Sequence, residues 1–499
     1  MKAQARILRI DPADNVAVAL ETIEAGQTIS VSAGTLPVLE KIPAGHKIAL
    51  APIDRGKAVV KYGHAIGLAL AAIKPGQWVH SHNLKTALSG QQQYQYAPLA
   101  PAPKPSGSAR TFMGFKRSDG SVGIRNEIWI IPTVGCINPA AEEIARNAAL
   151  RFADRRIDGI FCYPHPYGCS QLGGDLRATQ KILAALAKHP NAGGVVILGL
   201  GCENNHLDAF RSVLGNDDLD RVRFLNMQDV EDEIEEGLNL VGDLVKEAEL
   251  QHRQEVPLSD LVLGLKCGGS DGYSGISANP LLGEVTDRVT GAGATALLTE
   301  VPEMFGAETI LMARAVDETV FRQTVALING FKAYFQRYGQ PVYENPSPGN
   351  MEGGITTLEE KSLGCIRKGG RAPVCAVIGY GDRAIAPGLN LLNGPGNDMV
   401  STTAIAAAGA QMVLFTTGRG TPLGGPVPTL KVASNSSLAR RKPGWIDFDA
   451  GRLLEGAGMD DLAEELLDEI LKIASGDQRT LNETKNYRQI AIFKDGVTL

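Results

Sequence analysis

A lysine, a cysteine, a serine and an aspartate stand close together after one apolar run of this sequence. Residues 261–265 have the length and composition of a buried strand, and Lys266, Cys267, Ser270 and Asp271 follow directly, interrupted by two glycines. Open α/β sheets bind ligands at the carboxyl ends of their strands, where glycine lets the backbone approach closely. The pattern therefore favours a catalytic or binding loop over a polar turn that only caps the next helix.

Three further cysteines follow predicted strands in the same way. Cys136, Cys169 and Cys202 each come directly after a glycine. If their strands share one sheet with the strand before Cys267, four thiols converge on one edge and suit zinc or an iron–sulfur centre. No C-x-x-C spacing is present, so the usual zinc-finger pattern is absent, and a single free cysteine is often simply buried.

Histidines near the N-terminus offer a second kind of metal site. His80 and His82 lie two residues apart, and on a strand this spacing puts both imidazoles on one face. Imidazole with oxygen ligands suits a mononuclear Fe(II) or Mn(II) ion. We therefore expect a mononuclear ion and keep an iron–sulfur cluster on the cysteines as the alternative.

Other polar residues supply the remaining parts of an acid–base site. Arg419 is flanked by glycines and threonines and is suited to gripping a carboxylate, because guanidinium binds it bidentately. The candidate bases are His46, Lys47, His165 and Lys266. The candidate substrate contacts are Asn204, Asn205, Ser270, Asp271, Asn350, Arg419, Thr421 and Lys431.

The composition is that of a globular protein that does not bind polyanions. Of the 499 residues, 44% are hydrophobic and 21% are charged, and the formal net charge of −6 argues against nucleic acid or an anionic membrane as partner. No apolar stretch reaches the roughly 18 residues of a membrane span, and the first residues lack the apolar core of a signal peptide. Seven cysteines in so long a chain predict thiols in a reducing cytoplasm rather than a disulfide scaffold.

Three folded parts are expected to position these residues. Residues 1–97 have the short alternating runs and regular turns of a small β-rich domain, and a Pro/Ser/Gly linker covers 98–110. Residues 111–254 and 255–499 alternate strands with helices, which predicts α/β domains with mainly parallel sheets. Because pockets often form where domains meet, we expect the small domain to fold back over the strand ends.

Individual elements follow from the apolar periodicity. Asn138 is expected to cap a helix that runs to Arg151, and 229–250 is expected to be an acidic helix on an outer face. The glycine-rich segment 344–365 is expected to be a functional or mobile loop. Strands are predicted at 127–133, 158–163, 195–200, 222–226, 261–265, 295–299, 374–379, 411–416 and 429–433.

Longer motifs, spread over essentially the whole chain, resemble those of the altronate/galactarate dehydratase family. They are GHK at 45–47, KYGHAIG at 61–67, HSHN at 80–83, GSVGIRNE at 120–127, YGCSQLGGD at 167–175, GLGCENN at 199–205, KCGGSDGYSGISANP at 266–280, TEVPEMFGAE at 299–308, ENPSPGN at 344–350, GGITTLEEKSLG at 353–364, FTTGRGTP at 415–422 and AIFKDGVTL at 491–499. HSHN and EVPEMFGAE are similar to the altronate branch rather than the galactarate branch. One departure is Met351, where the family's pattern has a lysine next to the asparagine.

The resemblance implies a small β-clip domain of the SAF type, followed by two α/β regions. It implies a hydro-lyase of hexuronate catabolism that converts D-altronate to 2-dehydro-3-deoxy-D-gluconate, assisted by divalent iron or a similar metal. Galactarate dehydration, or a related sulfo- or hydro-lyase activity, is the alternative within the family. We further expect a small sugar-acid substrate and a homo-oligomer, a dimer.

Dehydration of a 2,3-dihydroxy acid removes the proton at C2 and expels the hydroxyl at C3. The C2 proton is not acidic because the neighbouring carboxylate is already anionic, so the developing enediolate needs concentrated positive charge. Two other classes of protein stay open. One is a thiol-nucleophile hydrolase, with Cys169 or Cys202 attacking and His165 or His206 as base. The other is a non-catalytic sugar-acid-binding protein.

Overall fold

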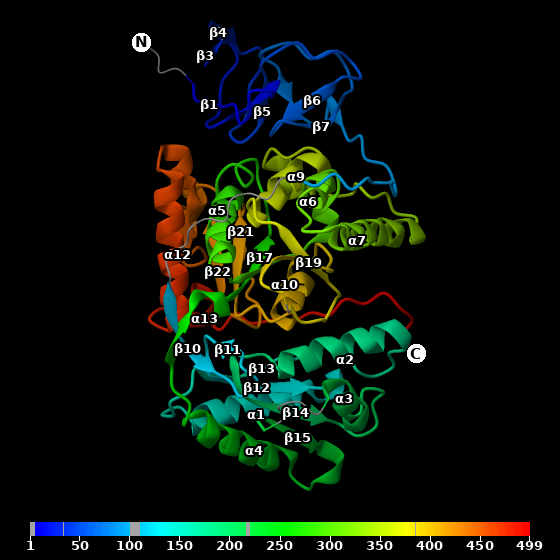
Figure 1. Ribbon diagram of the computed structural model, residues 1–499, viewed down its shortest axis with the longest axis vertical. Coiled ribbons are helices and arrows are strands. Elements are labelled where there is room, and N and C mark those ends of the chain that lie inside the picture. The colour runs from blue at the N-terminus through cyan, green and yellow to red at the C-terminus, as the bar shows by residue number, and fades with distance from the viewer. Residues whose placement is uncertain (1–4, 33, 100–109, 216–219, 385) are drawn as a thin grey trace.

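The computed structural model describes residues 5–32, 34–99, 110–215, 220–384 and 386–499. Three bodies follow one another along its long axis, with the small N-terminal domain at one end, residues 111–257 at the other and the carboxyl-terminal body between them (Figure 1). The predicted α/β class, with a strand-rich N-terminal part and parallel sheets after it, is confirmed. Most of the predicted linker, residues 100–109, lies outside the described residues.

The small domain is built from short antiparallel strands that alternate with tight turns. Its largest sheet has the order β1-β2-β5-β8, from Ile7–Leu8, Val16–Ala19, Lys47–Ala49 and Trp78–Val79. The others join β3 (Thr28–Val31) to β4 (Gly34–Pro37), and β6 (Ala58–Lys61) to β7 (His64–Ala69) and β9 (Leu84–Lys85). Side chains such as Val59 and Ile66 belong to the same apolar core as the carboxyl-terminal body, so the small domain is packed onto it.

The second body is a four-stranded parallel sheet of order β13-β12-β14-β15. The strands are β12 (Glu127–Pro132), β13 (Gly159–Cys162), β14 (Ala192–Gly199) and β15 (Val222–Asn226). Helices α1 (Asn138–Arg151) and α4 (Glu233–Ala248) cover one face, and α2 (Gly173–Ala187) and α3 (Leu207–Leu214) cover the other. A small antiparallel sheet of β10 (Thr111–Lys116), β11 (Val122–Gly123) and β16 (Gln254–Pro257) leads into and out of it.

The carboxyl-terminal body holds a seven-stranded parallel sheet of order β19-β20-β18-β17-β21-β22-β23. The strands are β17 (Val262–Cys267), β18 (Thr295–Leu298), β19 (Val374–Ile378), β20 (Gly388–Leu392), β21 (Met412–Thr417), β22 (Thr429–Ala433) and β23 (Phe448–Asp449). The helices are α5 (Ala278–Gly291), α6 (Glu308–Met312), α7 (Glu318–Arg337), α8 (Pro348–Glu352), α9 (Leu358–Cys365), α10 (Asp398–Ala407), α11 (Ser436–Arg441), α12 (Met459–Ser475) and α13 (Leu481–Thr484).

Three local predictions were wrong. The segment 344–365 is not a long loop, because a capping box of Ser347 and Asn350 starts α8, and α9 follows it. Asn138 is the first residue of α1 rather than its cap, since its side-chain amide donates instead to the carbonyl of His165 at 2.9 Å. Strand β20 was missed because its apolar run is short and is interrupted by Asn390.

The four cysteines do not share one sheet edge. Cys136, Cys169 and Cys202 follow β12, β13 and β14 of the second body, whereas Cys267 ends β17 in the carboxyl-terminal body. The expected convergence of four thiols is therefore wrong. No disulfide joins any of the seven cysteines, all of which lie in described residues.

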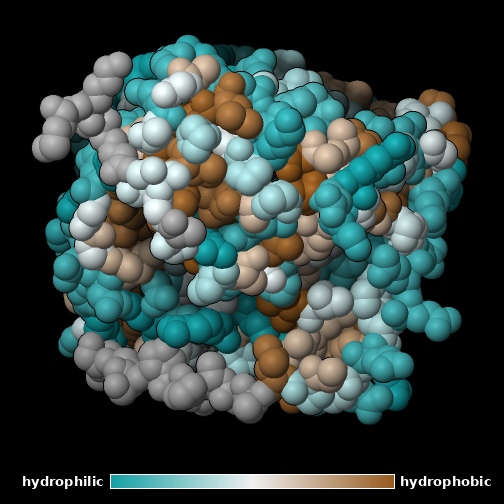
Figure 2. All heavy atoms as spheres, turned by 90° about the horizontal axis from the view of Figure 1, so that it is seen from above, coloured by the Kyte–Doolittle hydropathy of each residue, from teal (hydrophilic) through white to brown (hydrophobic). Residues whose placement is uncertain are grey.

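Among the described residues, no helix combines the length and the apolar character that crossing a bilayer requires. Seen from the small-domain end, hydrophilic residues are interspersed with apolar patches across the visible face (Figure 2).

Candidate active site

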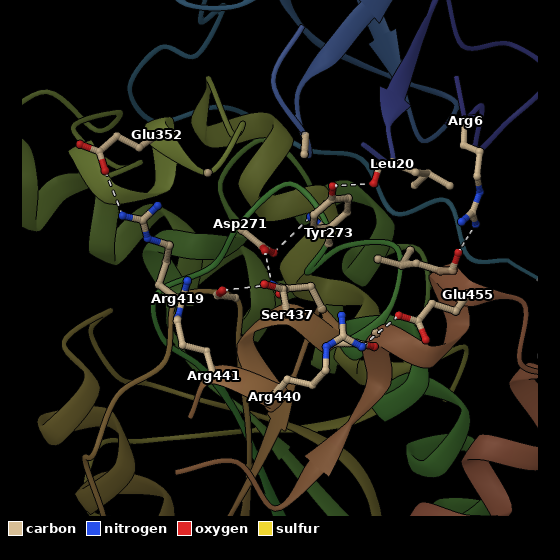
Figure 3. Close-up of a pocket in the computed structure, with 17 residues that line it drawn as sticks. Arg6, Leu20, Asp271, Tyr273, Glu352, Arg419, Ser437, Arg440, Arg441 and Glu455 are labelled. Carbon is tan, nitrogen blue, oxygen red and sulfur yellow. Dashed lines mark hydrogen bonds and ion pairs between the residues drawn. The ribbon is translucent and has the colours of Figure 1, made fainter. Parts of the chain in front are cut away.

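A cleft of about 680 Å³ opens between the small domain and the carboxyl-terminal body (Figure 3). Its floor lies where β17, β21 and β22 end, which are three adjacent strands of the seven-stranded sheet. The small domain closes it from above with Arg6, Leu20 and Ala44. The cleft thus occupies the place where α/β sheets bind ligands, and two domains build it, as the sequence predicted.

Four arginines make the walls of the cleft cationic. Arg419 follows β21, Arg440 and Arg441 end α11, and Arg6 reaches in from the small domain (Figure 3). Arg419 pairs with Glu352 at 2.9 Å, but both side chains are largely exposed. Such a pair contributes at most about 1 kcal/mol, so another carboxylate can displace Glu352. Within the described ranges Arg441 has no acceptor, which leaves its guanidinium available to an anion.

Asp271 lies buried at the floor of the cleft, and donors from several elements hold it. Its Oδ1 accepts hydrogen bonds from the Ser274 and Ser434 hydroxyls, at 2.9 and 2.7 Å, and its Oδ2 accepts one from the Asn435 amide at 2.9 Å. Burial raises the pKa of this carboxyl, although these donors oppose the shift. A Cβ at Gly418 would lie 2.2 Å from the Asp271 carboxyl carbon, so only glycine lets the β21 loop pass here.

Two histidines of the small domain hold the backbone at the end of α8. The His46 imidazole donates from Nε2 to the carbonyl of Glu352 at 3.1 Å, and His80 donates from Nε2 to the carbonyl of Met351 at 3.0 Å. The Trp78 indole donates to His46 Nδ1 at 3.1 Å, which fixes that tautomer. The two imidazoles stack with centroids 5.1 Å apart. Burial lowers the pKa of both, that of His46 to about 4, so both rings are neutral at pH 7.

This shift predicts a pH dependence of stability. Between pH 6.5 and about 4 the unfolded chain protonates His46 while the folded chain does not, so folding stability falls as the pH falls through this window. We expect the melting temperature of His46→Gln to depend less steeply on pH between these values than that of the parent protein. His82→Gln, at an exposed position of the same domain, is the control. Equal slopes for His46→Gln and the parent would contradict the assignment.

Two lysines of the small domain converge on one glutamate of α9. Lys47 and Lys61 lie 2.8 and 2.7 Å from the two carboxylate oxygens of Glu360, and all three side chains are buried. Although burial disfavours its charge, the two ammonium groups hold the pKa of Glu360 well below its ordinary value. Burial lowers the pKa of Lys47 to about 8. Because no part of this trio lines the cleft, we interpret it as the attachment of the small domain rather than as acid–base machinery.

A buried group of two thiols and a carboxylate lies at the carboxyl end of α9. The Sγ atoms of Cys267 and Cys365 are 3.5 Å apart and donate to Glu303 at 3.3 and 3.2 Å. Among the described residues this is the one trio of His, Cys, Asp or Glu whose ligand atoms all lie within 4.8 Å of one another. However, Lys361 pairs with the same carboxylate at 2.9 Å, and the Lys368 ammonium also acts on it. Two adjacent cations repel a metal ion, so the trio does not fit a divalent metal.

Lys266 is not available as a base. It is buried, and its ammonium is bound by Glu300 and by Asp398, the latter at 2.8 Å. Although burial opposes the charge, Glu300 and Asp398 together raise the pKa of Lys266 well above its ordinary value. The residue therefore stays protonated and holds the end of β17 to its neighbours.

Comparison with known proteins gives full-length relatives. The chain is 50% identical to the altronate dehydratase of Escherichia coli strain K12 over 494 residues, 99% of both chains. It is 49% identical to the altronate dehydratase of Bacillus subtilis strain 168 over 498 residues, again 99% of both. It is 32% identical to the galactarate dehydratase (L-threo-forming) of E. coli K12 over 509 residues, 97% of this chain and 96% of that protein.

Family descriptions match the three bodies in turn. Residues 5–87 match the altronate/galactarate dehydratase SAF domain, and 114–249 match the D-galactarate dehydratase/altronate hydrolase second domain. Residues 258–498 match the D-galactarate/altronate dehydratase C-terminal domain. The chain belongs to the altronate/galactarate dehydratase family. The resemblance drawn from the sequence motifs is thereby confirmed.

In this member of the altronate/galactarate dehydratase family, only part of the predicted site comes together. Asp271 and Arg419 line the cleft. His46, Lys47, His80, Ser270 and Asn350 lie behind its wall, around residues 350–361, where the Asn350 amide donates to the Ser270 carbonyl at 2.8 Å.

The remaining predicted residues lie elsewhere. Thr421 is outside the cleft, and Lys431 is buried in β22 beside Asp447. His80 and His82 sit in a turn after β8 rather than on a strand, so the expected shared face does not exist. The others belong to the loops of the second body: Cys136, His165, Cys169, Cys202, Asn204 and Asn205.

The structure argues against a thiol hydrolase. His165 is buried with both nitrogens engaged, because Nε2 donates to the Pro132 carbonyl at 2.7 Å and Nδ1 accepts from the Tyr167 amide at 3.2 Å. His206 caps α3 by accepting from the Ala209 amide at 3.4 Å. Neither histidine is placed to activate Cys169 or Cys202.

Several cleft and network residues were missed in the sequence. Glu300, Glu303, Glu360 and Lys361 stand inside motifs already matched to the family, so a search for buried charge within those motifs could have found them. The polar run 435–441, with its N-cap asparagine and paired arginines, also carried a usable signal.

Proposed function

We propose that this chain is an altronate dehydratase, a hydro-lyase that converts D-altronate to 2-dehydro-3-deoxy-D-gluconate and water. The observation that carries the proposal is the cleft itself. It sets unpaired guanidinium charge beside hydroxyl and amide groups of Asn435, Ser436 and Ser437, as a polyol with one carboxylate requires. Its volume of about 680 Å³ lies in the ordinary range for small-molecule sites. Altronate dehydratases also stand among its full-length relatives.

The residues of the cleft have different roles in the proposed reaction. Arg419 and Arg441 bind the substrate carboxylate and stabilise the negative charge that grows on it as C2 loses its proton. Asp271 takes that proton through Oδ2, which has a single hydrogen-bond donor in Asn435, and the pKa of this carboxyl, raised by burial, suits a general base. Asn435 and Ser437 orient the substrate hydroxyls. Tyr273 closes the cleft by donating from its hydroxyl to the Leu20 carbonyl at 3.2 Å (Figure 3).

A divalent ion, Fe(II) with Mn(II) as the alternative, is part of this proposal. His46 does not fit as a ligand, because Trp78 donates to its Nδ1 and its Nε2 proton is donated to the Glu352 carbonyl. His80 is the residue that would hold the ion, because the tautomer with its proton on Nδ1, beside Ser81 Oγ at 3.0 Å, would leave Nε2 free next to the Met351 carbonyl. An ion bound by His80 would supply a Lewis acid. The His46 ring stacks on that of His80 and would hold it in place.

Chelation tests the metal. We expect exhaustive chelation to abolish dehydration, and ferrous or manganous ion alone, without sulfide, to restore it. His80→Ala should lower the affinity for Mn(II), measured by titration, by about 10- to 100-fold, while His82→Ala should leave it unchanged. Full activity after chelation would remove the ion from the proposal.

The activity is tested by offering pure sugar acids to the purified protein. We expect 2-dehydro-3-deoxy-D-gluconate from D-altronate, and kcat/KM for D-altronate to exceed that for galactarate by at least about tenfold. Preference for galactarate would move the chain to the other branch of the family. Binding of both acids without turnover would make it a sugar-acid-binding protein.

The cellular setting belongs to the same proposal. We place the enzyme in hexuronate catabolism in the cytoplasm, as a homo-oligomer that is a dimer. Seven cysteines without a disulfide suit a reducing compartment.

A further inference from the structure

Three exposed cysteines stand at one edge of the second body. Cys136, Cys169 and Cys202 follow β12, β13 and β14, which are adjacent in the order β13-β12-β14. The parallel strands all end at this edge, and the loop after each of them carries one exposed thiol. None of the three lines the interdomain cleft. Exposed thiols oxidise readily, so three on one edge need a reason beyond packing.

Hydrogen bonds join the three loops into one unit. The Gly135 amide donates to the Tyr167 carbonyl at 2.8 Å, which ties the β12 loop to the β13 loop. The Asn205 backbone amide donates to the Gly168 carbonyl at 3.0 Å, and the Ser170 backbone amide donates to the side-chain oxygen Oδ1 of Asn204 at 2.9 Å. The β13 loop therefore also binds the β14 loop, and the backbone around all three thiols is fixed.

Each cysteine is preceded by a glycine that close contact requires. A Cβ at Gly135 would lie 2.8 Å from the His165 carbonyl oxygen, and one at Gly168 would lie 2.0 Å from that of Thr133. A Cβ at Gly201 would lie 2.6 Å from Gln228 Oε1. Gly168 and Gly201 also have φ of +99° and +127°, which favour glycine. Glycine at these three equivalent positions therefore allows the loops to pack against one another.

The spacing of the thiols distinguishes between kinds of metal centre. Among the described residues, no trio that includes these thiols has its ligand atoms within 4.8 Å of one another, as one ion would require. An iron–sulfur cluster binds each thiolate on a different iron and so accepts wider spacing. In addition, the buried Asn205 donates its amide to the Thr133 carbonyl, while its Oδ1 has no partner in the described ranges. Because the Asn205 backbone is bound to the loop of Cys169, that oxygen would be available as an acceptor for a group held at this edge.

We propose that Cys136, Cys169 and Cys202 hold an iron–sulfur cluster of the four-iron type, with three thiolate ligands and one iron left open. The cluster lies on the second body and is separate from the ion proposed for the cleft. The inference goes beyond the dehydratase proposal and does not depend on it, because its evidence is the geometry of the second body alone.

The test uses the full-length protein, purified without oxygen and then reconstituted with ferrous iron and sulfide. We expect a broad absorbance band near about 400 nm, and about four irons and four acid-labile sulfides per chain. Cys136→Ala, Cys169→Ala and Cys202→Ala should each lower the bound sulfide by about tenfold. Because these side chains are exposed, the variants should fold, which an unchanged thermal melt would verify.

Cys162→Ala is the matched control. Cys162 is the last residue of β13, in the same body, but it is partly buried against the apolar cluster under α1 and α4, whereas the other three thiols are exposed. The control should retain the band and the sulfide. Absence of sulfide after reconstitution, zinc in place of iron, or an equal loss in Cys162→Ala would each overturn the proposal. Activity on altronate enters none of these readouts, so the two proposals can fail separately.

Discussion

Glu360→Gln is expected to destabilise the protein by about 3–5 kcal/mol and to lower kcat/KM for D-altronate by about a hundredfold. The neutral amide leaves the buried ammonium groups of Lys47 and Lys61 without their carboxylate. Glu360 also accepts hydrogen bonds from the backbone amide and the hydroxyl of Thr356, at 2.9 and 2.8 Å. The substitution therefore also weakens the support of the segment that runs from Thr356 to the cleft. Urea unfolding and steady-state kinetics on the same preparation measure both effects.

A matched control distinguishes the loss of a buried carboxylate from the loss of an exposed one. Glu318→Gln removes one partner of the exposed Arg322 pair on α7 and should change stability by less than about 0.5 kcal/mol. A change of under about 1 kcal/mol for Glu360→Gln would show that the trio does not attach the small domain. This point substitution is a sharper test than deleting residues 1–97, because the small domain shares its apolar core with the carboxyl-terminal body and deletion would expose that core.

Arg419→Lys is expected to lower kcat/KM for D-altronate by about tenfold or more, and Arg419→Ala by about a hundredfold. Lysine keeps the charge but loses the bidentate fork, and each charge-assisted contact to a carboxylate contributes roughly 1.5–3 kcal/mol. The exposed pair with Glu352 contributes little to the free energy of folding, so most of the loss in kcat/KM should come from weaker substrate binding rather than from lower stability.

Arg452→Lys serves as the control for Arg419. Arg452 is an exposed arginine of the segment 450–455, pairs with Glu465 at 2.7 Å and does not line the cleft. It should leave the kinetics unchanged. If Arg419→Lys matched the parent protein in kcat/KM, the substrate carboxylate would have to bind elsewhere, with Arg441 as the next position to test.

The sequence by itself determined the secondary-structure elements and the sheet edge at which the candidate site residues lie. Apolar runs such as 261–265 and 411–416 predict strands because burial of alternating or continuous apolar residues is a local property of the chain. The strand-end rule predicted Asp271 and Arg419 as site residues, and both line the cleft, since glycine and polar residues directly after a strand can be recognised without knowledge of distant partners. Family motifs supplied the activity, which no local pattern specifies.

Only the tertiary structure decided which strands share a sheet and which charges pair. Cys136 and Cys267 both follow an apolar run, yet their strands belong to different sheets, because sheet membership depends on long-range packing. Lys61 and Glu360 are 299 residues apart in the chain, and their pairing exists only because the small domain docks on α9. Docking removes water from both groups. A charge buried in this way is costly unless it is paired, and only the fold determines which residue lies close enough to pair with it.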